Sequence, residues 1–325
     1  MVLQIQGIKN KLFKHSNAFD IGLGKVRIGM ATFVVAVDGS GDFDSIQEAI
    51  NALPSTGGSI HIKEGTYKIT STISIAKNDI YLFGNGKGTI LENQGLNAGN
   101  PFIDINNPRV KLERLWIKGT STGVQSINID ITGNDVKIRN CWITDATDTG
   151  IGINGNYIEI SGNIIDSNKY GIEAGGNNNI ITKNHIINNS EFGIFATEII
   201  KSIITGNNVS TNTKHGIVIS AEFNPSNNNI ISNNICDGND TGATGNYSGI
   251  EVSGSDNNII SNNRCIGNGK YGINIFNNTC DKNIIIGNIC LGNTTGAIND
   301  AGTNTHPNGA SGTTNLALDD LNIIA

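Results

Sequence analysis

From residue 137 onward, hydrophobic and polar positions repeat with a spacing of about 20 to 30 residues. Each repeat holds a Gly-Ile pair and, 10 to 15 residues further on, the phrase Ile-x-x-Asn. The pairs are Gly150-Ile151, Gly171-Ile172, Gly193-Ile194, Gly216-Ile217, Gly249-Ile250 and Gly272-Ile273, and the phrases end at Asn163, Asn184, Asn207, Asn234, Asn263 and Asn288. Short β-branched runs separated by Asn and Gly turns are typical of a solenoid with stacked strands. The pattern therefore predicts an all-β fold, a single-stranded parallel β-helix.

The chain before this region has a different pattern, which predicts a strand followed by one short helix. Ile46, Ala49, Ile50 and Leu53 have the i, i+3, i+4, i+7 spacing of an apolar helix face. Asp44 is placed to cap a helix over about 44–53, and this helix would cover the open end of the first coil. Strands are expected at 33–37, 59–63, 72–75, 80–83, 89–91, 102–105, 110–117 and 127–131, with turns at 38–42, 64–66 and 84–86.

These patterns divide the chain into three parts. We expect an N-terminal arm or attachment segment over residues 1–32, the β-helix over 33–300, and a C-terminal cap or tail over 301–325. The period is lost in the last part, where Leu316, Leu318, Leu321 and Ile323 are candidates for a closing cap or an oligomer contact. One turn is lengthened at 239–246, and solenoids often place binding contacts on such loops.

Stacking in the repeat gives the cysteines and asparagines a structural interpretation. Cys236, Cys265 and Cys290 each follow a repeat Asn by two residues, so we expect a column of buried free thiols. Side chains that point the same way cannot surround a metal, and they make a disulfide awkward. Cys141 is expected to replace Asn one coil before Asn163. The Asn column is expected to be structural, because Asn tolerates left-handed turns and its amide can bond to neighbouring rungs.

Residues 33–92 also carry a family resemblance. The segments Val37-Asp38-Gly39-Ser40-Gly41-Asp42-Phe43, Ile46-Gln47-Glu48-Ala49-Ile50 and Ile62-Lys63-Glu64-Gly65-Thr66-Tyr67 resemble the opening of the pectin-lyase-like right-handed β-helix superfamily. They are most similar to the start of pectin methylesterases, while the later coils resemble the generic β-helix repeat. The resemblance covers residues 33 to about 295 and implies a right-handed parallel β-helix with a short N-terminal capping α-helix. It does not specify an activity.

The esterase signature is incomplete at the positions that the resemblance implies. Pectin methylesterases use two Asp, an Arg and oxyanion-stabilising Gln side chains. Gln125 lies at the first Gln motif, and Asp148 matches the acid/base aspartate. The nucleophilic Asp would fall near Tyr170 and the Arg-Pro-Trp segment has no counterpart, which disfavours esterase activity. Tyr170-Gly171-Ile172-Glu173 resembles a phrase of mannuronan-epimerase-like β-helices without its His, and the polygalacturonase motifs are absent.

The residues around the Gly-Ile pairs form the candidate site. Alternation turns them outward, and a strand spacing of about 4.8 Å stacks them into a strip of aromatic and charged side chains. Such a strip could hold an extended sugar chain; the alternative is a filled corner with solvated charges. The candidate substrate-binding residues are Lys169, Tyr170, Glu191, Phe192, Lys214, Tyr247, Lys270 and Tyr271. The candidate catalytic residues are Asp148, Glu173, His215 and Glu251.

Composition and charge narrow the classes of partner. Only 15% of the residues are charged, so Asn, Gly, Ser and Thr must supply most of the polar surface, which argues against disorder. The net charge of −6 argues against nucleic-acid binding. No apolar stretch approaches 18 residues, so no membrane span is expected, and the N-terminus lacks a signal-peptide pattern.

Three functions fit these observations. The first is a surface or virion spike-like protein that binds a polysaccharide or cell-surface glycan, located outside the cell or on a virion. Residues 1–32 would then contact a homotrimer partner, a virion or a tail protein. The second is a polysaccharide lyase, glycoside hydrolase or epimerase acting in a groove along the helix, with Ca²⁺ expected only for a lyase and no other cofactor. The third is a purely structural scaffold.

Overall fold

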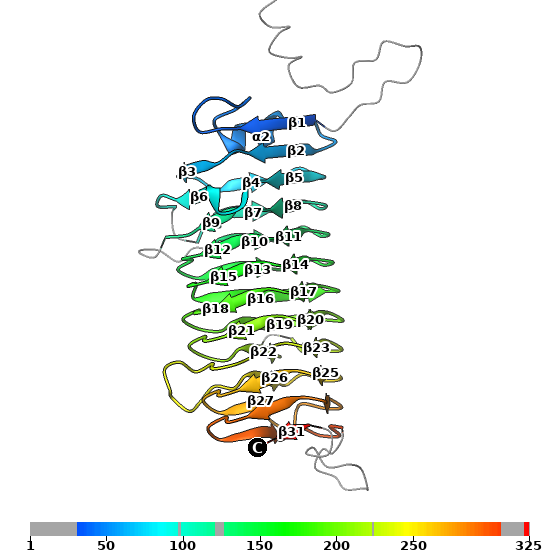
Figure 1. Ribbon diagram of the computed structural model, residues 1–325. Helices are drawn as coiled ribbons and strands as arrows, with labels where there is room; N and C mark the ends of the chain where they lie inside the picture. Colours follow the sequence, from blue (N-terminus) through cyan, green and yellow to red (C-terminus); the bar gives the residue numbers. More distant parts are fainter. Residues whose placement is uncertain (1–30, 97–98, 121–126, 223, 307–321, 325) are drawn as a thin grey trace, which may run out of the picture.

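The computed structural model describes residues 31–96, 99–120, 127–222, 224–306 and 322–324. They form a parallel β-solenoid with three long faces (Figure 1). Short strands alternate with turns because many residues between them take positive φ, among them Gly162, Lys183 and Asn233. The longest face has 11 strands, so the solenoid makes about 11 turns. The predicted fold class is confirmed.

The three faces are named sheets A, B and C, in the order in which each coil visits them. Sheet A contains β1 (Ala31–Val35), β2 (Gly58–Ile62), β5 (Ile80–Phe83), β8 (Lys111–Glu113), β11 (Lys137–Arg139), β14 (Glu159–Ser161), β17 (Ile180–Thr182), β20 (Ile203–Thr205), β23 (Ile230–Ser232), β25 (Ile259–Ser261) and β28 (Ile284–Ile286). All of its neighbouring strands pair in parallel.

Sheet B is interrupted once and sheet C is continuous. Sheet B contains β3 (Gly65–Ile69), β6 (Thr89–Asn93), β9 (Trp116–Lys118), β12 (Trp142–Thr144), β15 (Ile164–Asp166), β18 (His185–Ile187) and β21 (Asn208–Ser210), then β26 (Arg264–Ile266), β29 (Ile289–Leu291) and β31 (Ile323–Ile324). Sheet C contains β4 (Ile73–Ile75), β7 (Ile103–Ile105), β10 (Ile129–Ile131), β13 (Thr149–Ile153), β16 (Tyr170–Asn177), β19 (Ile194–Ile200), β22 (Ile217–Ser220), β24 (Ile250–Ser253), β27 (Tyr271–Ile275) and β30 (Gly296–Asp300). The 3-10 helix η1 (Gly86–Gly88) lies in a turn.

Columns of aliphatic side chains fill the interior. Strand pairing stacks Ile138, Ile160 and Ile181 on sheet A, and each of them is fully buried. Because alternate residues of a strand point to opposite faces, a fixed register keeps every column inside over many coils. The same register therefore fixes which side chains share the outer surface.

A helix covers the N-terminal end of the solenoid, and one of its side chains bonds the open edge of sheet C. Helix α2 (Ile46–Ala52) buries Ile46, Ala49 and Ile50, as the spacing predicted. Its cap is Ser45, whose Oγ accepts a hydrogen bond from the Glu48 amide at 3.3 Å, so the prediction of Asp44 was wrong by one residue. Gln47 bonds the free edge of β4 through both its amide atoms, to the backbone N and O of Ser74. The open edge is thus covered by hydrogen bonds.

The Asn column is confirmed as a hydrogen-bonded ladder. Asn207 Oδ1 accepts from the backbone and side-chain N–H groups of Asn184 at 3.0 Å, and Asn234 bonds Asn207 in the same way. The left-handed residue is not the ladder Asn but the residue before it, such as Lys183 or Asn233, so that part of the reasoning was wrong. The ladder asparagines contribute buried amides rather than turn geometry.

The cysteines also occupy their predicted places. Cys265 pairs with Cys290 across sheet B, and all five cysteines are buried free thiols. The backbone N of Cys141 donates to Asn163 Oδ1 at 2.9 Å, so Cys141 continues the ladder as predicted. Burial raises the pKa of Cys141 to about 12, which keeps this thiol protonated and unreactive.

Two strand boundaries differ from the sequence-based expectation. The expected turn at 64–66 is the start of β3, where Gly65 takes a φ of +148° and the buried Tyr67 donates to the carbonyls of Val35 and Lys63. The expected strand 110–117 is split into β8 and β9, because Arg114 adopts a left-handed φ of 54° that turns the chain. Most of the other expected strands are found within two residues of their predicted ends.

The repeat extends further toward the C-terminus than the sequence pattern indicates. Strand β31 pairs with β29, and Asn322 Oδ1 accepts from the Asn288 backbone N at 2.8 Å, which adds a rung to the ladder. The proposed arm over 1–32 falls almost wholly on residues 1–30, outside the described part, as do Leu316, Leu318 and Leu321. Within the described ranges, no helix has the length and hydrophobicity needed to cross a membrane.

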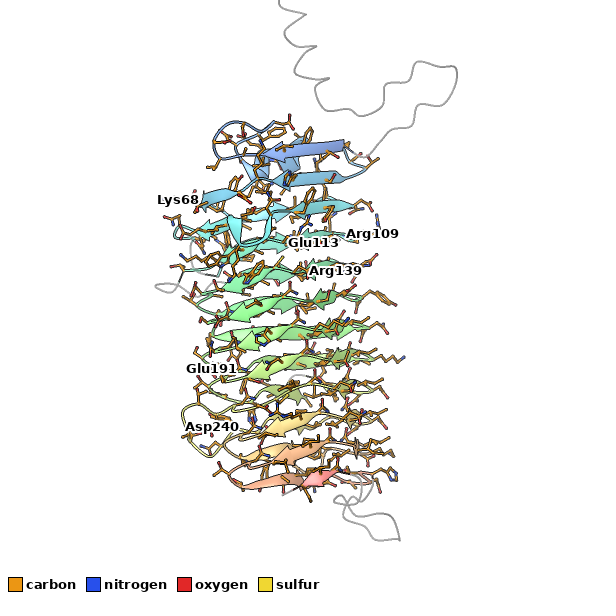
Figure 2. The ribbon with its side chains drawn as sticks, viewed as in Figure 1. Lys68, Arg109, Glu113, Arg139, Glu191 and Asp240 are labelled. Atoms are coloured by element: carbon orange, nitrogen blue, oxygen red, sulfur yellow. The ribbon has the colours of Figure 1, made fainter. Side chains whose placement is uncertain are left out.

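Figure 2 labels side chains from different parts of the solenoid. Glu113 and Arg139 belong to strands of sheet A, whereas Glu191 and Asp240 belong to the turns that lead from sheet B to sheet C (Figure 2). The second group borders the candidate strip.

Candidate functional site

Strand pairing confirms that the predicted strip lies on the outer face of sheet C. Tyr170 pairs with Thr149, and Glu173, Phe195 and Val218 stand on successive rungs ending at Glu251. Residues one place before each Gly-Ile pair form a second outer column beside them, which includes Phe192 and His215. The rung spacing of about 4.8 Å sets the distances along both columns.

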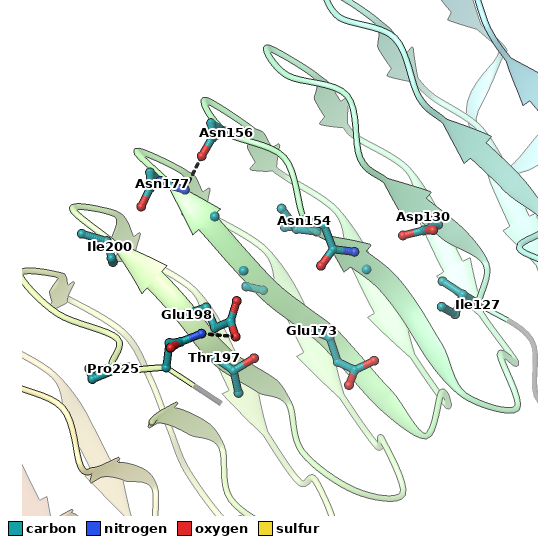
Figure 3. A pocket seen from close by; sticks show the side chains of 16 residues that line it. Ile127, Asp130, Asn154, Asn156, Glu173, Asn177, Thr197, Glu198, Ile200 and Pro225 are labelled. Atoms are coloured by element: carbon teal, nitrogen blue, oxygen red, sulfur yellow. Dashed lines mark hydrogen bonds between the residues drawn. The ribbon is translucent and has the colours of Figure 1, made fainter. Parts of the chain in front are cut away.

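Two hollows meet on this face at Glu173. The first, of about 680 Å³, is lined by residues of β10, β13, β16 and β19 and the segment after β22, including Asp130, Asn154 and Glu198 (Figure 3). Gly152 lies between Asp130 and Glu173 in the sheet, and its missing side chain leaves room there. The second hollow, of about 490 Å³, continues over β16 to β24. We call the pair the sheet C groove.

Aromatic rings line the second hollow. The Phe192 ring centroid lies 5.1 Å from that of Phe195 and 5.8 Å from that of Tyr170. His215 continues the row at 5.7 Å from Phe192, and Tyr247 packs edge-on against His215 at 5.0 Å. Together these rings form a nonpolar surface whose repeat follows the strands.

The lengthened loop 239–246 places Tyr247 at the end of this row. Asp240 is buried, and its carboxylate accepts hydrogen bonds from the backbone N–H groups of Thr244, Gly245 and Asn246 at 2.8 to 3.2 Å. Burial raises the pKa of Asp240, but these bonds lower it below the usual value overall. The loop is therefore fixed by a charged group that its own amides surround.

Two lysines beside the rings are already ion-paired. Lys169 Nζ lies 3.0 Å from Asp148 Oδ1 and also over the Tyr170 ring. Lys214 Nζ bonds to Glu191 and lies 5.4 Å from the Phe192 ring centroid. Each ammonium thus meets a carboxylate and an aromatic face, an arrangement that fixes the rings as well as the charges.

His215 is held neutral with a defined tautomer. Its Nδ1 accepts a hydrogen bond from the Ser248 backbone N at 2.8 Å, so the proton of the neutral ring is on Nε2, which faces Glu251 Oε2 at 3.6 Å. Burial, helped by the positive charge of Lys270, lowers the pKa of His215 to about 4. Asn274 Nδ2 donates to Glu251 Oε2 at 2.8 Å.

The glutamates on the groove floor have pKa values above the ordinary one. Burial raises the pKa of Glu173, although the Thr149 hydroxyl bonds to its carboxylate. Burial raises the pKa of Glu251 and of Asp130 in the same way. These carboxyls have neutral partners and remain accessible to a ligand, so each can accept a hydrogen bond or carry a proton.

Glu173 and Glu251 do not form the carboxylate pair of a glycosidase. They stand three rungs apart on sheet C, a separation of about 14 Å along the helix axis. Glycoside hydrolysis uses carboxyls about 5 to 9.5 Å apart. In the described part of the chain, no group of three or more His, Cys, Asp and Glu side chains is arranged to hold a metal ion.

The structure therefore brings together most of the predicted residues, but not as one cluster. Tyr170, Glu173, Glu191, Phe192, Lys214, His215 and Glu251 line the second hollow. Asp148, Lys169 and Tyr247 lie at its border, while Lys270 stands over the Tyr271 ring one rung further along.

The sequence-based list of site residues missed Asp130, Glu198 and Glu222, which the fold adds to the groove. Asp130 precedes the regular repeat, and Glu198 lies where the register between β16 and β19 shifts. Phe195, which pairs with Glu173, faces outward as alternation along the strand predicts.

Two of the positions compared with pectin methylesterases, Asp148 and Tyr170, lie on neighbouring rungs at the start of sheet C strands. Tyr170, which occupies the place of the nucleophile, pairs with Thr149 one rung after Asp148. Gln125 lies outside the described residues. Asp148 is ion-paired with Lys169 rather than placed on the groove floor.

The fold and the groove define a parallel β-helix protein of the pectin-lyase-like class. The family model described as right handed beta helix region matches residues 125–289, about half of the chain, so the protein belongs to this family. A second model, Pectinesterase, matches residues 32–100, which confirms the resemblance seen at the N-terminus.

Curated relatives match only part of their own length. Pectinesterase 5 of Arabidopsis thaliana is 34% identical over 160 residues, which cover 45% of this chain and 26% of that protein. A pectinesterase/pectinesterase inhibitor of Brassica campestris is 32% identical over 142 residues, covering 39% of this chain and 24% of that protein. The chain thus spans about a quarter of these relatives.

Solved structures share the fold at low identity. The Dettilon tailspike protein has a TM-score of 0.65 at 20% identity, covering 77% of this chain and 51% of that one. The Azotobacter vinelandii mannuronan C-5 epimerase AlgE6 A-module has a TM-score of 0.56 at 14% identity, covering 81% of this chain and 95% of that one. Pectate lyase Pel9A has a TM-score of 0.53 at 17% identity, covering 86% of this chain and 78% of that one. At these identities the likeness concerns the fold.

Proposed function

We propose that the sheet C groove binds a polysaccharide chain that lies along the axis of the solenoid. The observation that carries the proposal is the row of Tyr170, Phe192 and Phe195, whose ring centroids lie 5.1 to 6.1 Å apart. Sugar rings stack on aromatic faces, and the rung spacing is of the same order as one sugar unit in an extended chain. Half-buried carboxylates beside the rings supply acceptors for hydroxyl groups.

The names of relatives and structural neighbours support the same class of ligand. The relatives are called pectinesterases, and the neighbours include a mannuronan epimerase, a pectate lyase and a tailspike. We further propose a place outside the cell or on a virion surface, with residues 1–32 as the attachment segment and 301–325 as the closing part of the solenoid. A homotrimer or a virion partner is the proposed assembly.

The test is binding to a panel of neutral and acidic glycans, measured by titration calorimetry. Phe192→Ala should weaken binding about three- to tenfold, because it removes one stacking surface. Tyr157→Ala is the matched control, since Tyr157 is 62% exposed and stands in the turn before β14, outside the groove. Absence of binding to every glycan, or equal loss from both variants, contradicts the proposal.

A second candidate is catalysis on the same chain, favoured by the contact between His215 and Glu251. A neutral imidazole 3.6 Å from a carboxylate with a raised pKa resembles a proton-transfer pair. Incubation with the same panel, followed by ultraviolet absorbance of unsaturated products and by reducing-end assays, tests this. Turnover that Glu173→Gln or His215→Ala abolishes without loss of binding would favour the enzyme; binding without turnover favours the receptor.

A further inference from the structure

We infer that the sheet C groove selects a glycan without carboxylates and excludes polyuronates. This inference rests on the proposed function and specifies its ligand class. It runs against the expectation from the names of the relatives, since pectate and mannuronan are acidic polymers. The charges that line the groove carry it.

Acidic side chains dominate the lining. Six carboxylates line the two hollows together with a single ammonium group, that of Lys214. The six are Asp130, Glu173, Glu191, Glu198, Glu222 and Glu251. Lys214 is ion-paired with Glu191, so its charge is already matched inside the protein. His215 adds no charge at neutral pH. A uronate chain would place its carboxylates against this lining.

The lysines at the border of the groove do not make its net charge positive. Lys169 pairs with Asp148 at 3.0 Å, and Lys270 stands over the Tyr271 ring beyond the lining. Counting these border residues with the lining gives seven carboxylates and three ammonium groups. The surroundings of a bound chain are therefore acidic by several charges.

Among the residues that the structure describes, sheet C has no arginine, the planar cation best suited to carboxylates. Arginine recognises carboxylates through two parallel hydrogen bonds. Among the described residues, the arginines stand on or beside strands of sheets A and B: Arg109, Arg114, Arg139 and Arg264. A polyuronate would find no bidentate partner in the described part of the groove.

The floor carboxylates suit hydroxyl groups. Glu173 and Glu251 accept hydrogen bonds from Thr149 and Asn274, which are neutral donors. The charges of Lys169 and Lys270 act on the two carboxylates without a direct ion pair, and burial outweighs them. A sugar hydroxyl can donate to such an oxygen, whereas a uronate carboxylate can only repel it. Because the floor is half-buried, this repulsion is screened less than at an open surface.

The effect of the glycan's charge can be measured with pairs of polymers that differ only in their carboxyl groups. Polygalacturonate, polymannuronate and a glucuronan are each tested as the acid and after reduction of the carboxyls to alcohols, alongside neutral glycans. For any of these polymers that binds, the reduced form should bind at least about tenfold more tightly than the acid form at about 10 mM salt. Raising the salt to about 1 M should strengthen binding of the acid form and narrow the gap, because screening weakens repulsion.

A double variant tests the floor directly. Glu173→Gln with Glu251→Gln removes two charges from the floor, so the ratio between the affinities for the reduced form and for the acid form should fall about tenfold, whatever the change in binding of the reduced form. Glu48→Gln is the control, because Glu48 is exposed on helix α2. Tighter binding of the acid form, or acid binding that weakens with salt, overturns the inference while leaving glycan binding intact. An unchanged gap in the double variant also overturns it. If nothing on the panel binds, the proposed function fails and the inference fails with it.

Discussion

Glutamates on sheet A and sheet C stand on the same kind of rung but have opposite pKa shifts. On sheet A, burial raises the pKa of Glu113, yet hydrogen bonds from Lys111 and Tyr81 lower it below the usual value overall. Arg139 and Ser161 do the same for Glu159. On sheet C, burial dominates and the pKa of Glu173 and of Glu251 is raised.

The difference lies in the partners that each face provides. Sheet A places a cation beside each of these glutamates, on the same strand for Glu113 and on the neighbouring strand for Glu159, so their ionisation stabilises the fold. Sheet C gives them neutral partners, so ionisation works against folding while the oxygens stay available to a ligand. Ionisation of the sheet A glutamates thus contributes to stability, whereas that of the sheet C glutamates does not, which is consistent with the proposal that sheet C is the binding face.

The Asn ladder that includes Asn207 and Asn234 follows the strands of sheet A, and breaking it should give the largest effect. Asn234→Leu removes the acceptor of the Asn207 backbone N and the donor to the Ile204 carbonyl, all within a buried column. The expected loss is about 3 kcal/mol or more in the free energy of unfolding, since buried unpaired polar groups are costly. Urea denaturation measures it.

The control for this substitution is Asn246→Leu in the exposed part of the long loop. It should change stability by about 0.5 kcal/mol or less. Similar losses from the two variants would show that the ladder amides do not hold the coils together, and the comparison of faces would lose its common scaffold.

The repeat alone was sufficient to predict the solenoid, the inward thiols and the outward strip. These follow from register, since a period-2 strand stacked at a fixed offset assigns every residue to one side. Cys141 could be placed in the Asn ladder by counting back one coil. The cap at Ser45 was missed because Ser45 and Asp44 are both good N-cap residues and only backbone geometry separates them.

The site was less predictable because it depends on features between the repeats. Glu222 enters the groove from the segment after β22, and Glu198 from a bulged strand, and neither has a counterpart at the same place in other coils. The ion pairs of Lys169 and Lys214 decide whether the strip is basic or acidic. The sequence places lysines and carboxylates on neighbouring rungs, but whether they form ion pairs depends on the directions of their side chains.

The next largest effect concerns His215 in acid. Its folded pKa of about 4 lies below the ordinary 6.5, so the unfolded state binds more protons between these values. This part of the stability is complete above pH 6.5 and is lost as the pH falls toward 4, by up to about 3 kcal/mol. His215→Gln should remove that slope in urea unfolding between pH 7 and 4.5. The control is His185→Gln at an exposed position of sheet B, which should keep the same slope of stability against pH. An unchanged slope in His215→Gln would show that burial of His215 does not cause the loss of stability in acid.

A smaller effect of opposite sign on the two faces tests the comparison itself. Glu251→Gln should stabilise the protein at pH 7 by roughly 1 kcal/mol, because a raised pKa means that stability is lost as the pH rises through it. Glu159→Gln should destabilise by a similar amount at pH 7, because a lowered pKa contributes stability that is lost as the pH falls. Both differences should shrink as the pH falls and the carboxyls become protonated. The same sign for both variants at pH 7 would remove the distinction between the faces.

The smallest effect on stability is expected for an outward column of isoleucines on sheet A. Ile180, Ile203, Ile230, Ile259 and Ile284 form an outward column over five successive rungs. Ile230 is 38% exposed, so Ile230→Thr keeps the β-branched shape and should change the free energy of unfolding by less than about 1 kcal/mol. Glycan binding should stay unchanged, because the column lies on a different face from the rings. A loss of binding comparable to that of Phe192→Ala would place the ligand on sheet A and reverse the assignment of the two faces.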